Sequence, residues 1–261
     1  MTKTDFPLDP DFDKLWPVAP PPITIVYGEF GLGKTTLALD TGAIPERTLG
    51  VGFEGGMKAY AEQVNFVHWD VTKIMADEKP TGWKDADVYD VLVKKLDAVP
   101  AGQFDVLVLD NASPFEDAHV SKIEAQPSIV GLTANQVNDS IALKFAGMKK
   151  LYFNNLMRWS AKFKMIVITL QMRDRFDGKK PMKDPLTNKT MREPKGKETL
   201  AMVSSLSLGL EPGTGGIPAA NVAKCRIDRR VWVADVSQPP TGITQEQIET
   251  QLNRIEQELS T

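Results

Sequence analysis

The feature that most constrains this chain is a glycine-rich octapeptide between an apolar run and a helix-like run. It reads Gly28, Glu29, Phe30, Gly31, Leu32, Gly33, Lys34 and Thr35, and Thr36 follows it. This is the G-x-x-x-x-G-K-[ST] pattern, in which glycines let the backbone wrap phosphates and present N–H groups to them. The β-branched run Ile23 to Tyr27 predicts a strand before the loop, and a helix is expected from about Lys34. The octapeptide therefore predicts a phosphate-binding loop at a strand-to-helix turn.

Two residues of the pattern and one beyond it are expected to hold the phosphates and a metal ion. Lys34 would reach the β- and γ-phosphates, and the Thr35 hydroxyl would bind Mg²⁺. Asp110 closes the buried run 104–109, where it can hold a magnesium-bound water. The alternatives are a glycine-rich turn that matches by chance and a capping aspartate.

Hydrolysis also needs a group that orients or deprotonates the attacking water. Glu54 follows the apolar run 48–53 among small neighbours and is the candidate base, while Glu29 is a weaker competitor. Gln171 follows the apolar run 165–170, so it is expected at the carboxyl edge of the sheet, where ligands of open α/β folds bind. A surface glutamate in a glycine turn and a strand-end amide bonded to local backbone are the alternatives.

Strand-like and helix-like segments alternate along the chain. We expect strands over 23–27, 48–53, 65–69, 104–109, 165–170, 205–210, 222–227 and 231–236, and helices over 57–63, 88–96 and 135–161. Residues 173–198 are rich in lysine and proline and predict a mobile, positively charged loop. The alternation predicts an α/β fold with a mostly parallel central sheet flanked by helices.

Three regions are expected in the chain. Residues 1–22 contain six prolines, which predict an extended arm, and residues 23–236 would form the core. Residues 237–261 would form a linker and a C-terminal amphipathic helix with Ile248, Leu252, Ile255 and Leu259 on one face. The arm and this helix would link protomers or pack on the body of their own chain.

Composition excludes several classes of protein. No apolar run approaches the roughly 18 to 20 residues of a membrane-spanning helix, so no membrane contact is expected. The start of the chain lacks the features of a secretory signal, and the single cysteine Cys225 fits a reducing cytoplasm. A net charge of −3 argues against coating nucleic acid by bulk electrostatics, so any nucleic-acid site must be local.

The order of these motifs resembles the core of RecA-type recombinases. The residues that carry the likeness are the GKTT loop, Phe53-Glu54-Gly55-Gly56, the strand ending in Asp110, a long helix and Leu170-Gln171-Met172-Arg173. The likeness spans roughly residues 23–236 and is closest to phage-encoded RecA-core ATPases that accompany single-strand annealing proteins. It implies a RecA-like P-loop NTPase fold with ATP and Mg²⁺ as cofactors.

The resemblance also assigns roles. It makes Glu54 the water-activating carboxylate and Gln171 the γ-phosphate sensor, and it turns the loop after Gln171 toward single-stranded DNA. Lys224 and Arg226 resemble a basic pair that contacts the nucleotide of a neighbouring subunit, and a charged strand edge is the alternative. The loop at 173–198 has more lysine and proline than the family's glycine-rich loop, so a solvated face is the other reading of its charge.

The leading hypothesis is an ATP-binding and ATP-hydrolysing protein of phage-type recombination or single-strand annealing. It would form a homo-oligomer, bind single-stranded DNA through residues 173–198, and work with an annealing or single-strand-binding protein. One alternative is a helicase or genome-packaging motor with the same core. Another is a nucleotide-dependent switch that recruits a protein partner.

Overall fold

The computed structural model describes residues 23–39, 45–61, 64–177, 180–185, 188–195, 204–212 and 218–225, with the side chains of 176, 177 and 221–225 excepted. The arm expected over 1–22, the strand over 231–236, the C-terminal helix and Arg226 lie outside this part of the chain.

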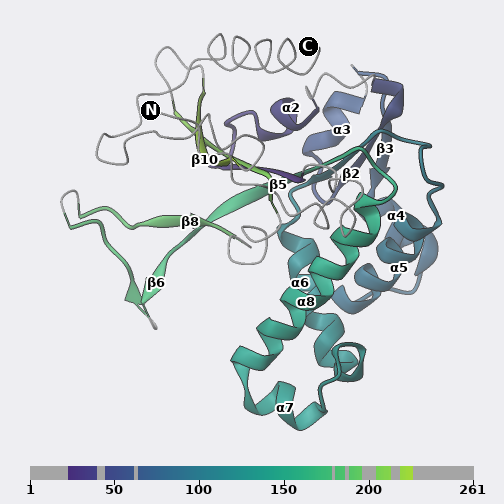
Figure 1. Cartoon of the computed structure of the whole chain (residues 1–261), viewed down its shortest axis with the longest axis vertical. Coiled ribbons are helices and arrows are strands. Elements are labelled where there is room, and N and C mark those ends of the chain that lie inside the picture. The colour runs from purple at the N-terminus through teal and green to yellow at the C-terminus, as the bar shows by residue number, and fades with distance from the viewer. Residues whose placement is uncertain are drawn as a thin grey trace, which may run out of the picture.

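One twisted sheet forms the centre of the described structure (Figure 1). Its main path runs β10-β9-β1-β5-β4-β2-β3, where the strands are β1 (Ile23–Gly28), β2 (Thr48–Gly52), β3 (Val67–Asp70), β4 (Val106–Asp110), β5 (Met165–Asp174), β9 (Leu206–Glu211) and β10 (Ala219–Cys225). Every pairing on this path is parallel except β10 with β9. The predicted α/β fold with a mostly parallel sheet is therefore confirmed.

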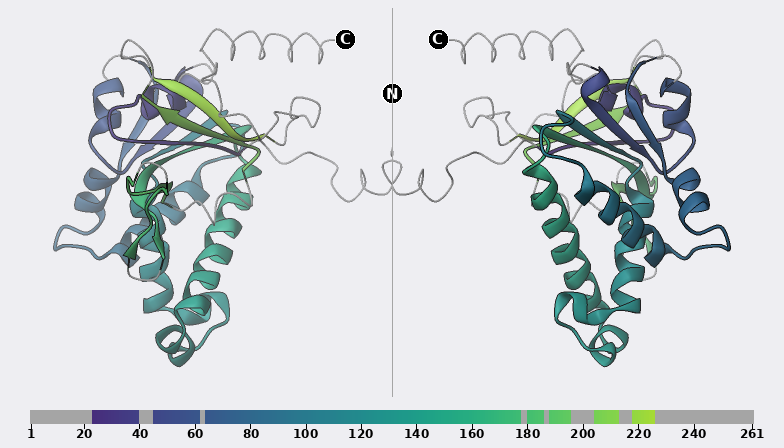
Figure 2. Two further views of the ribbon diagram at one scale, coloured as in Figure 1. Left: turned by 90° about the vertical axis from the view of Figure 1, so that its left-hand side faces the viewer. Right: turned by 90° about the vertical axis from the view of Figure 1, so that its right-hand side faces the viewer.

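Helices cover both faces of the sheet (Figures 1 and 2). One face packs against α2 (Lys34–Leu39) and α3 (Gly56–Ala61), and the other packs against α4 (Val71–Glu78), α5 (Asp85–Ala98), α6 (Ser113–Ala125) and α8 (Ile141–Ser160). The strand β4 shows how the sequence produces this, because successive side chains of a strand point to opposite faces. Val106 and Val108 join the core under α2 and α3, while Leu107 and Leu109 join the core under the larger helices.

The prediction of one continuous helix over 135–161 is wrong at Ser140, which separates α7 (Ala134–Asp139) from α8. Ser140 has extended backbone angles, with φ −134° and ψ 102°, and its hydroxyl accepts the Leu143 N–H at 3.3 Å. Serine is a favoured N-cap because its side chain replaces a missing helical acceptor. The apolar periodicity continues across the break, which is why it predicted one helix.

Short 3₁₀ turns occur at Pro45–Arg47 and Pro127–Val130.

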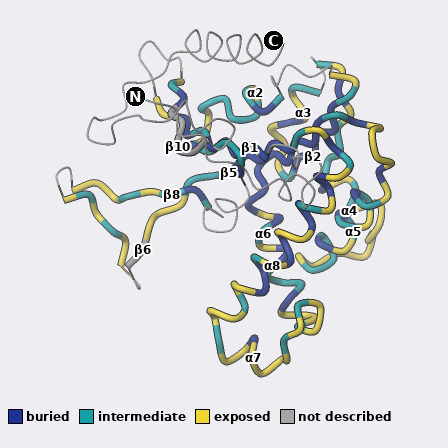
Figure 3. The backbone as a smooth tube through the Cα atoms, in the orientation of Figure 1, coloured by how far each residue is buried: buried dark blue, intermediate teal, exposed yellow. Residues whose placement is uncertain are grey.

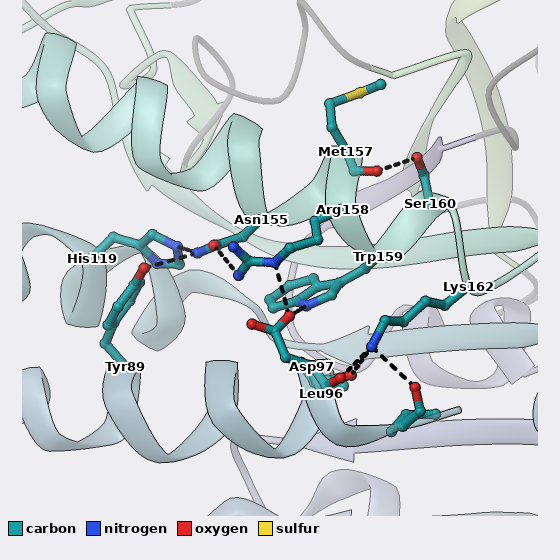
Figure 4. Close-up of polar contacts among 11 residues, drawn as sticks. Tyr89, Leu96, Asp97, His119, Asn155, Met157, Arg158, Trp159, Ser160 and Lys162 are labelled. Carbon is teal, nitrogen blue, oxygen red and sulfur yellow. Dashed lines mark hydrogen bonds and ion pairs between the residues drawn. The ribbon is translucent and has the colours of Figure 1, made fainter. Parts of the chain in front are cut away.

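Polar contacts bind α5 to α8 inside the larger helical layer (Figure 4). The Asp97 carboxylate accepts the Arg158 Nε–H and the Trp159 indole N–H, each at 2.9 Å. Lys162 donates to the carbonyls of Asp97 and Val99 at the end of α5. Trp159 is fully buried, so its only polar atom is satisfied where water cannot reach it.

A buried histidine connects α5, α6 and α8 in the same layer. His119 Nε2 lies 3.0 Å from Asn155 Nδ2, and its Nδ1 lies 2.7 Å from the Phe115 carbonyl oxygen. Burial lowers the pKa of His119 to about 4, so the ring is neutral at neutral pH. A neutral ring has one donor, and the carbonyl requires that it be Nδ1. Nε2 then accepts the Asn155 amide N–H, and His119 is a structural residue.

The predicted loop at 173–198 contains an ordered β arm, which we define as the described part of residues 173–195. β5 runs past the core and pairs through Met172–Asp174 with the antiparallel β8 (Arg192–Pro194). Beyond it, β6 (Phe176–Asp177) pairs with β7 (Lys180–Pro181). The prediction of a loop without secondary structure is wrong here, because backbone pairing needs no apolar side chains. The β arm projects away from the helices, and its described residues are mostly exposed (Figures 1 and 3).

Other differences from the expected elements are smaller. The strand expected over 65–69 is observed as β3. The strand expected over 222–227 is observed as β10, which begins three residues earlier, and residues 226 and 227 lie outside the described part of the chain. The helices α4 and α6 were not predicted. Within the described residues, no helix is both long and apolar enough to cross a membrane.

Candidate nucleotide-binding site

The glycine-rich loop joins β1 to α2, as its sequence predicts. Gly31 and Gly33 have φ of 80° and 74°, in the left-handed region that glycine occupies without steric cost. Gly28 is required for a different reason. A Cβ at this position would lie 2.7 Å from the Leu210 carbonyl oxygen on the neighbouring strand β9. The three glycines thus allow the loop to turn tightly beside the sheet.

The charged and hydroxyl groups of the loop point in different directions. The Lys34 ammonium donates to the carbonyl oxygens of Gly28 at 3.1 Å and Glu29 at 2.8 Å, so it lies inside the loop. Burial lowers the pKa of Lys34, and the carboxylates of Asp110, Glu29 and Glu54 oppose that shift. The Thr36 hydroxyl bonds instead to the Tyr60 hydroxyl of α3 at 2.7 Å.

Thr35 and Asp110 meet at the carboxyl edge of the sheet. The Thr35 hydroxyl lies 2.9 and 3.1 Å from the two carboxylate oxygens of Asp110. The Thr169 hydroxyl of β5 donates to the same carboxylate at 2.7 Å and accepts the Asn111 N–H at 2.7 Å. Asp110 is buried, and these hydroxyls fix its orientation. The fold therefore brings together the two residues that are expected to hold Mg²⁺.

Glu54 and Gln171 lie beside this pair. Gln171 Nε2 donates to both Glu54 carboxylate oxygens, at 3.0 and 3.2 Å. Asn111 Nδ2 donates to Glu54 Oε1 at 2.6 Å. Gln171 aligns with Gly28 across the β1–β5 pairing, which places it level with the start of the loop. The turn after β2 and the neighbouring ends of β4 and β5 thus bring together residues that are more than 100 positions apart.

The remaining loop residues face outward or toward the β arm. Phe30 is 93% exposed, whereas Leu32 is partly buried against the core under α2 and α3. The Glu29 carboxylate forms an ion pair with Arg192 on β8 of the β arm. Arg192 also contacts Asp174 at 3.4 Å and donates to the Met172 carbonyl oxygen at 3.0 Å. The phosphate loop and the β arm are therefore in direct contact.

Sequence reasoning missed three residues of this site. Thr169 carries a usable signal, because it is a hydroxyl residue inside the otherwise apolar run 165–170. Asn111 follows Asp110 directly, but nothing in the sequence shows that it would reach Glu54. Arg192 is 163 residues from Glu29, and its pairing follows from the course of the β arm alone. The side chains of the predicted pair Lys224 and Arg226 lie outside the described part of the chain.

The oxygen atoms of Thr35 and Asp110 are the donor type that Mg²⁺ prefers. Within the described residues, no group of three or more histidine, cysteine, aspartate or glutamate side chains is placed to hold a metal ion. Mg²⁺ commonly keeps several waters and takes one or two protein ligands, so the Thr35 and Asp110 pair fits it without a larger cluster.

Comparisons with known proteins give a family match and likenesses to solved structures. A family model described as an AAA domain matches residues 21–206. No curated protein matches the sequence. Among solved structures, the crystal structure of the RadB recombinase is 18% identical, with a TM-score of 0.43 over 84% of this chain and 88% of that chain. A likeness of this degree is too low to bear on function.

Proposed function

The chain belongs to the AAA domain family, and from this premise we propose that it is a magnesium-dependent ATPase with a RecA-like core that acts on single-stranded DNA in recombination or annealing. The observation that carries the proposal is the meeting of four residues at one sheet edge. The Thr35 hydroxyl lies 2.9 Å from Asp110, and beside them Gln171 donates to both oxygens of Glu54. A metal-binding pair next to an oriented carboxylate is what phosphoanhydride hydrolysis needs.

The proposed chemistry assigns one task to each group. Lys34 binds the β- and γ-phosphate oxygens, and the backbone N–H groups of residues 28–35 wrap the phosphates. Thr35 and Asp110 would hold Mg²⁺, which would offset the charge of the triphosphate. Glu54 orients the attacking water and takes its proton.

The β arm is the proposed DNA contact. Residues 173–195 contain eight basic and four acidic side chains, so the segment is positive although the whole chain has a net charge of −3. The side chains of Arg175, Lys180 and Lys183 are exposed on it. Exposed cations on a projecting segment can contact a phosphate backbone without requiring a basic protein as a whole.

Contacts at the base of the β arm support coupling between DNA and nucleotide. The Gln171 carbonyl oxygen accepts the Lys195 N–H at 2.9 Å, while the Gln171 side chain holds Glu54. Arg192 pairs with Glu29 in the phosphate loop. A shift of the β arm on DNA would therefore act on both the proposed base and the loop. This arrangement supports DNA-stimulated hydrolysis.

We also propose that the active form is a homo-oligomer in which ATP lies between neighbouring subunits. The exposed Phe30 ring in the phosphate loop supports this, because an aromatic side chain gains by being covered by a partner. In this assembly Lys224 and Arg226 would contact the nucleotide of the neighbouring subunit. An annealing or single-strand-binding protein is the expected further partner.

Binding of a fluorescent single-stranded oligonucleotide, followed by anisotropy near 0.15 M salt, tests the DNA assignment. ATP should strengthen binding relative to ADP, and the double variant Lys180→Glu, Lys183→Glu should weaken it. Each lost phosphate contact should reduce the slope of log K against log salt by about 0.7. Lys94→Glu, an exposed site on α5, is the matched control. An affinity for the oligonucleotide that changes neither with ATP nor in the double variant would exclude the β arm from DNA recognition.

A nucleotide-dependent switch that recruits a protein partner is the second candidate. The contact that favours it is the ion pair between Glu29 and Arg192, which could report the state of the phosphate loop to a protein on the β arm. This function predicts slow turnover that DNA does not change.

A helicase or packaging motor predicts closed rings, which negative-stain images with ATP would reveal.

A further inference from the structure

We propose that Asn111 is a positioning residue for hydrolysis, which holds Glu54 in its working orientation through Nδ2 and binds a site water through Oδ1. This inference rests on the proposed ATPase function, because it gives a task to a residue next to the proposed base. Asn111 Nδ2 lies 2.6 Å from Glu54 Oε1, the shortest of the hydrogen bonds that join Glu54 to Asn111 and Gln171.

Glu54 lies in a glycine-containing turn, so its side-chain orientation depends on the groups that bind its carboxylate. It lies beyond the end of β2, and Gly55 and Gly56 follow it. A Cβ built on either glycine would meet no atom within 4 Å, so no neighbouring group packs closely against these two positions. The amides of Asn111, directly after β4, and of Gln171 on β5 supply the restraint. Because amides are neutral, they orient the carboxylate without placing another charged side chain against it.

The backbone of Asn111 is held in a conformation that few residues adopt. Its φ is 49°, in the left-handed region, which asparagine tolerates better than most non-glycine residues. The Asn111 N–H donates to the Thr169 hydroxyl at 2.7 Å, and the Ala112 N–H donates to the Thr169 carbonyl oxygen at 2.9 Å. This bend directs the side chain toward Glu54. Backbone strain that surrounding contacts maintain is typical of functional sites.

The other end of the Asn111 amide gives an independent reason to expect a bound molecule. Asn111 is only 6% exposed, and its Oδ1 has no hydrogen-bond partner in the described structure. Leaving a buried acceptor unpaired costs about 1 to 3 kcal/mol. A water between protein and phosphate would satisfy this acceptor, and Asn111 would then orient both the proposed base and a water that the base can reach.

Three substitutions separate the side chain of Asn111 from its backbone. Asn111→Gly keeps the left-handed conformation and removes the amide, and Asn111→Ala removes the amide and adds strain. Asn111→Asp keeps the shape but replaces the donor with a second carboxylate beside Glu54. Each is compared with wild type by kcat and KM for ATP, by titration with a fluorescent ATP analogue, and by thermal melting.

The proposal predicts that Asn111→Gly and Asn111→Asp lower kcat by about 10-fold to 100-fold, as loss of positioning does. For Asn111→Gly, the KM and the affinity for the analogue should stay near those of wild type, because Asn111 forms no hydrogen bond with Lys34 or Thr35 in the described structure. Asn111→Asp adds a negative charge near the proposed triphosphate site, so its effect is compared through kcat alone. A wild-type kcat for Asn111→Gly and Asn111→Asp, with only Asn111→Ala impaired, would show a purely backbone role and overturn the inference. Wild-type turnover that persists in Lys34→Ala would instead overturn the proposed ATPase function, and this inference with it.

Discussion

Replacing Glu54 with glutamine tests the identity of the proposed base. The change preserves the length of the side chain and removes its charge and its ability to take a proton. An amide oxygen at position 54 can still accept an N–H from Asn111 or Gln171, which now donate at 2.6, 3.0 and 3.2 Å. The turn should therefore keep its shape. The substitution would therefore slow the chemical step of ATP hydrolysis.

The expected loss of rate in Glu54→Gln follows from the proposed role of Glu54 as a general base. Loss of a general base commonly costs about 10² to 10⁴-fold in rate. At about 1.36 kcal/mol for each factor of ten, this corresponds to about 2.7 to 5.4 kcal/mol in the activation barrier. Affinity for ATP should change little, because the Lys34 ammonium and the loop N–H groups are untouched.

Steady-state ATP hydrolysis and equilibrium titration with a fluorescent ATP analogue measure the two quantities separately. Glu124→Gln is the matched control, since Glu124 pairs with Lys144 at 2.8 Å on the surface at the end of α6. An exposed pair of this kind contributes about 0 to 1 kcal/mol, so this control should keep normal turnover and fold. Unchanged turnover in Glu54→Gln would remove Glu54 from the mechanism.

Three further predictions address the fold and the coupling. Trp159→Ala should lower the free energy of unfolding by about 3 to 5 kcal/mol in urea titrations, because the indole is fully buried and its partner Asp97 loses a donor; a loss below about 1 kcal/mol would contradict the packing described. His119 has a pKa of about 4 in the folded protein, against an ordinary value of 6.5. Between pH 6.5 and pH 4 the histidine is therefore protonated in the unfolded chain but neutral in the folded one, so the free energy of unfolding falls as the pH is lowered toward 4. In His119→Asn this fall should shrink by on the order of 3 kcal/mol, measured as unfolding free energy against pH, and an unchanged fall would exclude His119 as its source. Arg192→Ala, which breaks the ion pair with Glu29, should reduce the DNA stimulation of ATP turnover about fivefold or more, and full stimulation would disprove coupling through this pair.

The sequence predicted those parts of the site that depend on local order. A β-branched strand, a glycine loop and a helix are contiguous, so their geometry follows from their own residues. Glu54, Asp110 and Gln171 each follow an apolar strand, and parallel strands bring their carboxyl ends to one edge. Their convergence was therefore predictable without knowing which strands are neighbours.

The remaining features of the site and the fold could not be predicted, because they depend on tertiary contacts or leave no hydrophobic pattern. The contact from Asn111 to Glu54 requires that β2 lie next to β4 and that the backbone enter the left-handed region at Asn111, which Thr169 on another strand stabilises. The β arm has few apolar residues, so its strand pairing left no hydrophobic pattern to detect. At Ser140 the apolar periodicity continued across a capping residue and concealed the break between α7 and α8.

The most direct test of the central claim is ATP turnover measured with and without single-stranded DNA, with Lys34→Ala as the control for contaminating activity. The proposed function predicts magnesium-dependent hydrolysis that DNA stimulates and that Lys34→Ala abolishes. Turnover that Lys34→Ala leaves intact would contradict the assignment of this edge of the sheet as an ATPase site. Lys34-dependent turnover that DNA does not change would contradict the role on DNA and favour the protein-recruiting switch.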